Sequence, residues 1–345
     1  GGRMGVLTKC TVCLPLFLVL FTFAFSFFAG GWVCKYLRNP QSFTLEALPD
    51  LQGQVAVVTG ANTGIGYITA RELVRKGAQV IIGVRTDAKG AETLKKIEAE
   101  TGRKAIYVAP LDLSSLKSVK SFASEVTKQF SALTLLVNNA GVMACPWGQT
   151  SDGLEMQFGT NHIGHFALTS FLLGALKKGG TTTKKSRVVV LSSNAHTMGP
   201  PGGLDVGSWI RPHGDWYEKW TMYGQSKISN IMFAKELDRQ LLAESANVLA
   251  VALHPGFVVA DLARHLTGVE KFMVKDYGYG AVALTTEDGA LTTLYAATHD
   301  SIEALRGEYF EPLARRVDSH PDSYNVTTQK FLWTESEAIV KKILR

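Results

Sequence analysis

The chain has 345 residues and a mass of 37.5 kDa, of which 46% are hydrophobic and 19% are charged. This composition supports a packed core and excludes an intrinsically disordered or collagen-like chain. The net charge of +6 at pH 7 comes from 36 basic and 30 acidic residues of interspersed sign. That balance lacks the basic footprint of a nucleic-acid-binding protein, so we expect no nucleic-acid partner.

Residues 11–34 contain no charged side chain and are rich in Phe, Leu and Val. As a helix, this run is about 36 Å long and exceeds the roughly 30 Å hydrocarbon thickness of a bilayer. Trp32 and Tyr36 lie where interfacial aromatic residues occur. We therefore expect a single-pass membrane anchor in residues 1–38, followed by a linker in residues 39–51. The alternative is a cleaved signal peptide.

The cysteines contribute little to the expected fold. Three of the four lie in the anchor or at its edge, and only Cys145 lies in the rest of the chain. One thiol cannot build a disulfide framework, and no Cys/His cluster has the spacing of zinc ligands. We expect no metal site. Palmitoylation of Cys10 and Cys13 near a membrane stays open.

From residue 52 onward, apolar strand-like segments alternate with helical patterns, which predicts a parallel sheet. The expected strands are residues 54–59, 79–84, 104–109, 134–138, 187–192, 247–253 and, at the edge of the sheet, 307–310. The expected helices are residues 66–76, 88–100, 115–130, a long helix within 153–176, and 222–243. Right-handed crossovers then give a doubly wound, Rossmann-like α/β fold. We assign residues 52–312 to a single domain and 313–345 to an appended C-terminal tail.

A glycine-rich turn, Thr59-Gly60-Ala-Asn-Thr-Gly64-Ile-Gly66, follows the first expected strand. Its glycines permit a tight turn and close approach to a pyrophosphate, which the N-terminus of the next helix attracts. The order of strand, turn and helix is the one that a dinucleotide site needs, although the spacing differs by one residue from Gly-x-Gly-x-x-Gly. The cofactor-binding residues expected here are Gly60, Asn62, Thr63, Gly64, Ile65 and Gly66.

Arg85 follows the second expected strand, where a dinucleotide site distinguishes its cofactors. A guanidinium pairs with a ribose 2′-phosphate, so Arg85 favours NADP(H) over NAD(H). Asp87 lies two residues further on and leaves NAD(H) open. Asp112 and Leu113, after the third expected strand, are expected to lie against the adenine ring of the cofactor.

Tyr223 and Lys227 are four residues apart and share one face of the expected helix. A tyrosine titrates near 10, and a unit charge at roughly 4 Å contributes up to ~4 kcal/mol at an effective dielectric of about 20. This corresponds to about three pKa units, enough to lower the pKa of a phenol to where it exchanges a proton near neutral pH. Ser193, after the fifth expected strand, offers a second polar group to a reacting carbonyl. Asn161 is expected to link the Lys227 ammonium to solvent through a water molecule.

In their order along the chain, these motifs resemble the short-chain dehydrogenase/reductase family. The resemblance is carried by Thr59-Gly60-x-x-x-Gly64-x-Gly66, Asn138-Asn-Ala-Gly141, Asn161, Ser193, Tyr223-x-x-x-Lys227 and Pro255-Gly256. Finer stretches resemble its membrane-anchored retinol dehydrogenase-like subgroup, namely Asn138-Asn-Ala-Gly-Val-Met143, Asp152-Gly153-Leu, Asn161-His-Ile-Gly-His-Phe166 and His254-Pro-Gly256. The apolar N-terminal run is similar to that subgroup's anchor.

The resemblance implies roles for the candidate catalytic residues. Tyr223 is then the general acid/base, and Lys227 lowers its pKa and holds the nicotinamide ribose. Ser193 orients the carbonyl, and Asn161 maintains a proton relay. The remaining cofactor-binding residues that it implies are Asn139, Ala140, Gly141, Tyr223, Lys227, Pro255, Gly256 and Val258.

Some features near these motifs depart from the family or have other interpretations. Ala260 stands where the family often has a threonine that contacts the nicotinamide carboxamide. His162 and His165 invite a metal interpretation, but without a third ligand nearby we expect them to pack or form hydrogen bonds.

The segment between Ser193 and Tyr223 is long and rich in aromatic residues. It contains Trp209, Trp216, Tyr217 and Trp220. Together with residues 265–279, it is expected to form an aromatic, apolar wall or lid over the substrate. An ordinary packed excursion is the alternative.

The sequence therefore predicts an NADP(H)-dependent oxidoreductase that interconverts a lipophilic alcohol and its aldehyde or ketone, of retinoid, steroid or fatty-aldehyde type. The alternative is a membrane-attached NADP(H)-binding scaffold or sensor without significant turnover, in which residues 315–345 bind a partner. The subgroup resemblance favours the endoplasmic reticulum with a cytosolic catalytic domain, and the family resemblance implies a homodimer. The sequon at Asn325 bears on the membrane side, because only a luminal domain would be glycosylated there.

Overall fold

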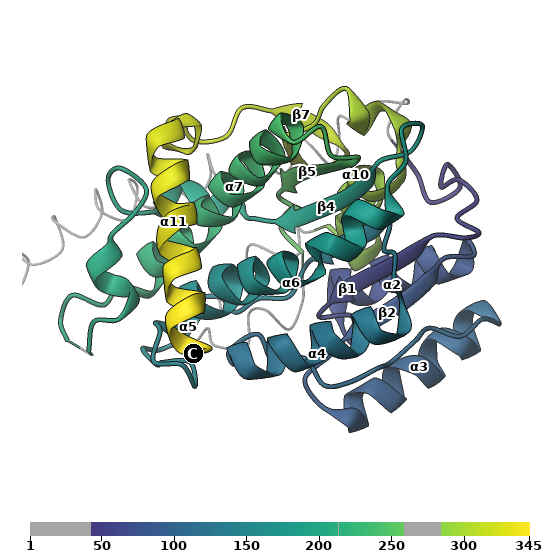
Figure 1. The fold of residues 1–345 in the computed structure, drawn as a ribbon, viewed down its shortest axis with the longest axis horizontal. Coiled ribbons are helices and arrows are strands. Elements are labelled where there is room, and N and C mark those ends of the chain that lie inside the picture. The colour runs from purple at the N-terminus through teal and green to yellow at the C-terminus, as the bar shows by residue number, and fades with distance from the viewer. Residues whose placement is uncertain (1–42, 213, 259–283) are drawn as a thin grey trace, which may run out of the picture.

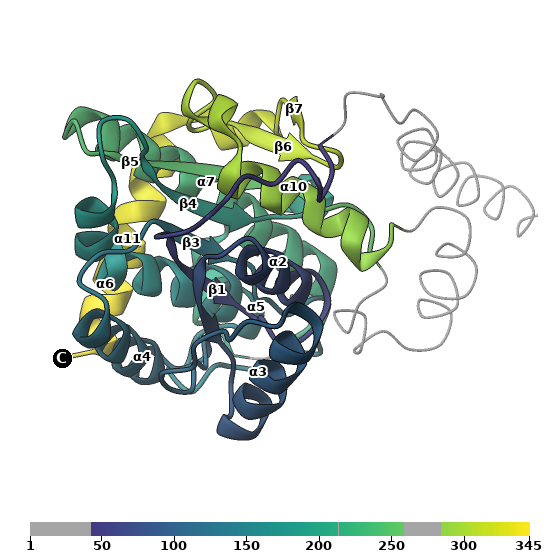
Figure 2. The ribbon, with the colours of Figure 1, turned by 90° about the vertical axis from the view of Figure 1, so that its right-hand side faces the viewer.

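The computed structural model describes residues 43–212, 214–258 and 284–345, in which a seven-stranded sheet lies between two layers of helices (Figures 1 and 2). The strand order is β2-β1-β3-β4-β5-β6-β7, and every neighbouring pair is parallel except β6 with β7. Within these ranges no helix is long and apolar enough to cross a membrane. The anchor expected in residues 1–38 lies outside them.

Strands β1 to β5 are almost wholly buried, as expected for a parallel sheet that is covered on both faces. The strand bounds are β1 Val55–Thr59, β2 Gln79–Gly83, β3 Leu135–Asn138, β4 Ser186–Leu191, β5 Val248–Leu253, β6 Tyr309–Glu311 and β7 Arg315–Val317. The register aligns their carboxyl ends, since Thr59 pairs with Gly83 and Leu191 pairs with Leu253. The segments that follow β1 to β5 therefore gather at one edge of the sheet.

One helical layer consists of α4 (Leu116–Gln129), α6 (Gly164–Gly179), α7 (Lys219–Ala243) and α11 (Val326–Ile343), which packs on α7. The other layer contains α2 (Gly64–Arg75), α3 (Asp87–Thr101) and α10 (Thr286–Thr298). Figure 2 shows α4, α6 and α11 on one side of β1 and α10 on the other. The short elements are α5 Met156–Phe158, η1 Gly159–Ile163, η2 Asn194–Met198, η3 Val206–Trp209, η6 Asp300–Glu303 and η7 Pro321–Tyr324.

Two expected strands differ from the structure. In residues 104–109 only Ile106 pairs with the sheet, through a single bridge to Ile81. The next residue, Tyr107, turns its hydroxyl to Asp87 at the start of α3, so the pairing does not extend into a strand. The strand predicted at the sheet edge is internal, because β7 covers β6 with an antiparallel pair.

The chain after residue 312 packs closely against the α/β core. Strand β7 completes the sheet, and α11 lies across α7 (Figure 1). The indole of Trp333 stacks on the ring of Phe233, with centroids 5.9 Å apart, and Leu332 is buried. Asn325 is the N-cap of α11, and its side chain accepts hydrogen bonds from the N–H groups of Thr327 and Thr328. The C-terminal helix is therefore part of the packed structure.

Candidate active site

Thr59, the last residue of β1, contacts the turn that follows β3. The strand order runs in opposite directions from these two neighbouring strands, so the topological switch point of the sheet lies between them. Oγ1 of Thr59 accepts hydrogen bonds from the N–H groups of Asn139 and Ala140, both at 2.9 Å. The Asn139 side chain donates in return to the Thr59 carbonyl at 2.7 Å. In doubly wound sheets the ligand crevice opens at such a switch point. These contacts therefore locate the crevice beside the glycine-rich turn.

The glycine-rich turn packs directly on this β3 turn. Gly60 and Gly64 have φ angles of +68° and +57°, a left-handed conformation that favours glycine. A Cβ atom on Gly66 would lie 2.3 Å from Nδ2 of Asn139 and 2.4 Å from the carbonyl oxygen of Gly60. A side chain at Gly66 would therefore separate the two turns that form the crevice. The other expected cofactor residues of this turn are exposed or half-buried, namely Asn62, Thr63 and Ile65.

The N-terminus of α2 faces the same crevice with its backbone donors. The side chain of its N-cap, Thr63, makes no capping hydrogen bond, and the first turn contains no acidic residue. The N–H groups and the positive end of the helix dipole are thus suited to an anion. Together with the glycine cradle, this arrangement fits the pyrophosphate of a dinucleotide.

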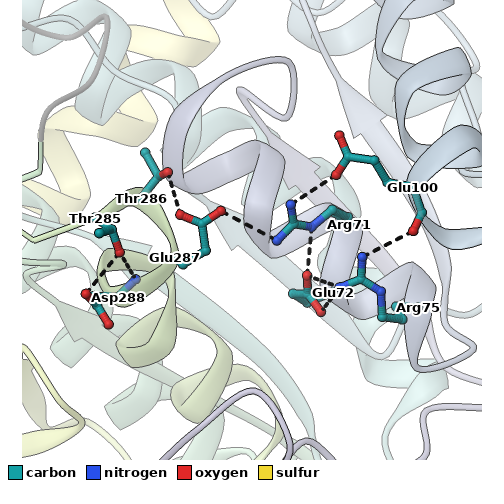
Figure 3. Close-up of polar contacts among 8 residues, drawn as sticks. All are labelled: Arg71, Glu72, Arg75, Glu100, Thr285, Thr286, Glu287 and Asp288. Carbon is teal, nitrogen blue, oxygen red and sulfur yellow. Dashed lines mark hydrogen bonds and ion pairs between the residues drawn. The ribbon is translucent and has the colours of Figure 1, made fainter.

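Arg71 holds α2 between α3 and α10, as Figure 3 shows. Its guanidinium donates to Glu72 at 2.7 Å and to Glu100, near the end of α3, at 3.0 Å. It also lies 3.7 Å from a carboxylate oxygen of Glu287 at the start of α10. The Arg71 side chain is only 13% exposed, so these pairs are partly shielded from solvent. This network fixes the helix that follows the glycine-rich turn.

Arg85 is exposed just after β2, and within the described ranges it forms no ion pair. The neighbouring Asp87 is occupied, because its Oδ1 accepts the hydroxyl of Tyr107 at 2.7 Å. This contact was not predicted, because Tyr107 was expected in a strand. The cation at this strand end is therefore available to a ligand, whereas the carboxylate already has a partner.

The remaining expected cofactor residues lie along the same edge of the sheet. Asp112 accepts hydrogen bonds from the backbone and hydroxyl of Ser114, and Leu113 is buried. After β5, the half-buried Pro255 leads to Gly256, which has a φ of +94°. Val258 then forms a single bridge to Leu284. Ala260 and residues 265–279 lie outside the described ranges.

Tyr223 and Lys227 occupy the buried face of α7 and are 3% and 5% exposed. The Nζ atom of Lys227 lies 5.6 Å from the centroid of the Tyr223 ring. It donates to the carbonyl of Leu191, the last residue of β4, at 3.2 Å. Burial lowers the pKa of Lys227 to about 8. A cation is thereby held beside the phenol in a site that disfavours charge.

Asn161 lies in η1, a single π-helical turn between α5 and α6. Such turns are frequent at functional sites. Its Oδ1 accepts the N–H of Val142 at 2.8 Å, and its Nδ2 donates to the Val142 carbonyl at 2.9 Å and to Oγ of Ser226 at 3.0 Å. The Ser226 hydroxyl in turn donates to the carbonyl of Tyr223 at 2.8 Å. Asn161 is thus connected to the helix that carries Tyr223.

Ser226 was not predicted as a site residue. The available signal was its position directly before Lys227 in the tyrosine motif. A second observation brings Asn161 close to the lysine: a Cβ atom on Gly141 would lie 3.1 Å from Oδ1 of Asn161 and 3.7 Å from Nζ of Lys227. The side chains of Asn161 and Lys227 therefore converge on the backbone of one glycine.

Ser193 follows β4 and begins η2, where its Oγ accepts the N–H of Ala195 at 3.2 Å. Gly224, the residue after Tyr223, allows α7 to touch this turn. A Cβ atom there would lie 2.7 Å from the carbonyl oxygen of Ala195 and 2.7 Å from the nitrogen of Gly199. The turn that carries Ser193 consequently packs against α7 at Tyr223.

The aromatic residues of the segment between Ser193 and Tyr223 lie in different surroundings. This segment was expected to form an aromatic wall over the substrate, with an ordinary packed excursion as the alternative. Trp209 follows the alternative, because it is buried and stacks on Phe158 with ring centroids 4.3 Å apart. The flat, fully covered stack favours burial of a large apolar ring in the core. Tyr217 donates to the carbonyl of Cys145 at 3.0 Å. Trp220 packs edge-on against Tyr223, with ring centroids 6.3 Å apart.

His162 and His165 are buried and hydrogen-bonded. His165 bridges the two halves of the site, since Nδ1 donates to the carbonyl of Asn161 and Nε2 accepts the hydroxyl of Thr59, both at 2.9 Å. Burial lowers the pKa of His165 to about 4, which keeps the ring neutral. In the described part of the chain, no group of three His, Cys, Asp or Glu residues could hold a metal ion.

Comparison with known proteins agrees with this arrangement of motifs. The short chain dehydrogenase family profile matches residues 54–204. Retinol dehydrogenase 12 from Bos taurus is 39% identical over 313 residues, which is 90% of this chain and 90% of the relative. The chain belongs to the short-chain dehydrogenase/reductase family. It is also 36% identical to retinol dehydrogenase 14 from Homo sapiens over 306 residues, which is 84% of this chain and 87% of the relative.

Solved structures show the same fold. A crystal structure of an uncharacterized protein from Mycobacterium paratuberculosis has 34% identity and a TM-score of 0.69, covering 87% of this chain and 98% of that one. A Pseudomonas aeruginosa protein in an NADP active-site complex has 22% identity and a TM-score of 0.59, covering 76% and 95%. This member of the family is therefore retinol dehydrogenase-like in sequence and Rossmann-like in fold.

Proposed function

We propose that this short-chain dehydrogenase/reductase uses NADP(H) to interconvert a lipophilic alcohol and its aldehyde or ketone. The observation that carries the proposal is the buried pair of Tyr223 and Lys227, whose ammonium lies 5.6 Å from the phenol ring. The turns of Ser193 and Asn161 pack around this pair. A bound nicotinamide cofactor supplies or accepts the hydride.

The chain itself must orient the substrate and move one proton. In carbonyl reduction, the Tyr223 hydroxyl donates its proton to the carbonyl oxygen, and the Ser193 hydroxyl donates a hydrogen bond to the same atom. In alcohol oxidation, the Tyr223 phenolate accepts the proton from the alcohol. The Lys227 ammonium favours that phenolate by its charge. Asn161 fixes the backbone around Gly141 and connects it to α7.

Arg85 is proposed to pair with the 2′-phosphate of NADP(H). The support is its exposure at the end of β2 and the engagement of Asp87 by Tyr107. A guanidinium would form charge-assisted hydrogen bonds with a phosphate and gain little from a hydroxyl. The NADP complex of the Pseudomonas aeruginosa structure shows that this fold accommodates the cofactor in another protein.

A lipophilic substrate is proposed from three features. The relatives named above are retinol dehydrogenases. The indole of Trp220 lies against Tyr223 and offers an apolar surface beside the reacting group. The uncharged run of residues 11–34 is proposed to anchor the enzyme in a membrane, where such substrates partition. We place the domain on the cytosolic face of the endoplasmic reticulum, as a homodimer.

Replacement of the acid/base tests the enzymatic proposal. The full chain and its Tyr223→Phe variant are assayed with NADPH and NADH against retinaldehyde, a steroid ketone, a long-chain aldehyde and a short water-soluble aldehyde. We expect NADPH-dependent turnover of the lipophilic carbonyls and a loss of at least about 1000-fold in Tyr223→Phe, since both proton donor and oxygen ligand are removed. A variant as fast as the parent would contradict the mechanism. Equal turnover of short and long aldehydes would contradict the substrate class.

The membrane side has its own test at Asn325. This residue is exposed, so a luminal domain would present the sequon to the glycosylation machinery. We expect glycosidase treatment of the full chain from mammalian cells to leave its electrophoretic mobility unchanged. Thr327→Ala removes the sequon and serves as the control. A mobility shift in the parent that disappears in this variant would place the domain in the lumen.

A further inference from the structure

Two buried histidines connect the C-terminal segment with the turns that carry Asn161 and Ser193. His162 directly follows Asn161 in η1, and His196 lies three residues after Ser193 in η2. Their exposed fractions are 1% and 4%. Each forms a hydrogen bond with a residue from the final part of the chain.

The first connection comes from α11. Nε2 of His162 lies 2.9 Å from Oγ of Ser336, a serine with no exposed surface. Burial lowers the pKa of His162 to about 3, so the ring is neutral. In the first turn of α6, Nδ1 of His165 donates to the carbonyl of Asn161 in the same π-helical turn. Two histidine side chains therefore stabilise this turn, and π-helical turns are intrinsically rare.

Aromatic contacts of helix α11 hold Ser336 in position for this hydrogen bond. Trp333 of this helix stacks on Phe233 of α7 and packs edge-on against Phe166 of α6, with the latter ring centroids 5.0 Å apart. The helix thus rests on α6, which directly follows η1, and on α7, which carries Tyr223. Its Ser336 contacts His162 of η1.

The second connection comes from the segment that precedes α11. Nδ1 of His196 donates to the carbonyl of Ser193 at 2.7 Å, and Nε2 accepts the N–H of His320 at 3.0 Å. Both ring nitrogens are used, which requires the neutral ring in one tautomer. The Tyr309 ring packs edge-on against this imidazole at 5.2 Å. The backbone of Ser193 is consequently connected through one imidazole to the backbone of His320.

We propose that residues 320–336 set the geometry of the catalytic centre by acting on Ser193 and Asn161 through two separate histidine contacts. His162 and His196 are positioning residues, and neither touches the substrate. The inference rests on the proposed function, because it takes Ser193 and Asn161 as groups that act during proton and hydride transfer. Cutting either contact should slow the chemical step and leave binding of substrate and cofactor nearly unchanged.

The experiment uses the full chain with Ser336→Ala and, separately, His196→Phe. The matched control is Ser186→Ala: this buried serine donates to the carbonyl of Leu133 at 3.0 Å and lies at the amino end of β4, away from the site. Measured are kcat, KM, the NADPH dissociation constant and the primary isotope effect with NADPH deuterated at the transferred position. A typical buried hydrogen bond predicts a roughly fivefold fall in kcat for each positioning variant.

We expect KM and the NADPH dissociation constant to stay within about twofold of the parent, and the isotope effect to rise because hydride transfer becomes more rate-limiting. Ser186→Ala should lose comparable stability and keep the kcat of the parent. Unchanged kcat in both positioning variants would overturn the proposal. A fall in kcat that the control shares would also overturn it, since that would reflect general destabilisation.

Hydrogen exchange gives a readout that does not depend on turnover. Ser336→Ala should accelerate exchange in residues 159–163 and leave 194–198 unchanged, whereas His196→Phe should do the reverse. If the parent lacks turnover but shows these local effects, the proposed function fails and the positioning contacts stand. If the parent turns over and neither segment responds, the positioning proposal fails alone.

Discussion

The Nζ atom of Lys227 lies 5.6 Å from the ring centroid of Tyr223, on the same buried face of α7, and donates to the carbonyl at the end of β4. A buried ammonium is costly for the folded protein, and its pKa of about 8, below the ordinary 10.5, expresses that cost. Lys227, which is proposed to lower the pKa of the Tyr223 phenol, therefore destabilises the folded protein.

Lys227→Met should make the protein more stable at pH 7, by up to about 3 kcal/mol. The unfolded chain binds this proton more tightly than the folded one, so the penalty is fully present below pH 8. It declines as the pH rises towards 10.5, and the advantage of the variant should vanish there. Urea unfolding of both proteins at pH 7 and pH 10 checks this. An advantage that does not change with pH would contradict the cause assigned to it.

Gly224→Ala should damage catalysis through a close contact. The new Cβ would lie 2.7 Å from the carbonyl oxygen of Ala195, so α7 and η2 must separate where they carry Tyr223 and Ser193. We expect a loss of about 1–3 kcal/mol in stability from overpacking, and a fall of at least tenfold in kcat. Thermal unfolding and steady-state kinetics measure both.

The matched control for that change is Gly174→Ala in α6. A Cβ atom there meets no heavy atom within 4 Å. The substitution should stabilise the helix by about 0.5–1 kcal/mol and leave kcat unchanged. Equal losses of kcat in the two variants would show that close approach at Gly224 is not the reason for the effect.

Arg85→Gln should reduce the preference for NADPH over NADH at least tenfold. The substitution removes charge-assisted hydrogen bonds to the 2′-phosphate of NADPH, each worth about 1.5–3 kcal/mol. Binding of NADH should change little, because its 2′-hydroxyl forms no such bonds with Arg85. The ratio of kcat/KM for the two cofactors is the measurement. Arg103→Gln, at an exposed arginine beyond the end of α3, should leave the ratio as it is. An unchanged ratio in Arg85→Gln would reject the assigned role.

Thr59→Val should weaken both the fold and cofactor binding. The valine cannot accept the N–H groups of Asn139 and Ala140, which lose a partner at the floor of the crevice. We expect a loss of about 1–3 kcal/mol in stability, together with weaker NADPH binding. Thr59→Ser keeps the hydroxyl and should retain most of both properties. Urea unfolding and a fluorescence titration with NADPH distinguish the variants, and normal binding by Thr59→Val would contradict this account.

Several parts of the fold could be predicted because they depend on local pattern. The strands at Val55–Thr59 and Leu135–Asn138 are short apolar runs, and the glycine-rich turn stands where the backbone must bend sharply. Residues 104–109 were wrongly predicted to form a strand. An apolar run does not reveal how many of its residues will pair with the neighbouring strand, and here only Ile106 does. Helices α10 and α11 were not predicted, since their stability depends on the surfaces that they cover.

The sequence by itself determined the order of strands β1 to β6, most helices up to α7, and the pair four residues apart on α7, because backbone periodicity and helix geometry are local properties. Only the tertiary structure decided that Trp209 belongs to the core, that Asp87 is hydrogen-bonded to Tyr107, and that the last helix contacts the turn that carries Asn161. Those contacts join residues distant in the chain, and the low pKa of Lys227 arises from the packing of several elements around it. Burial and partner choice are properties of that packing, which local pattern does not specify.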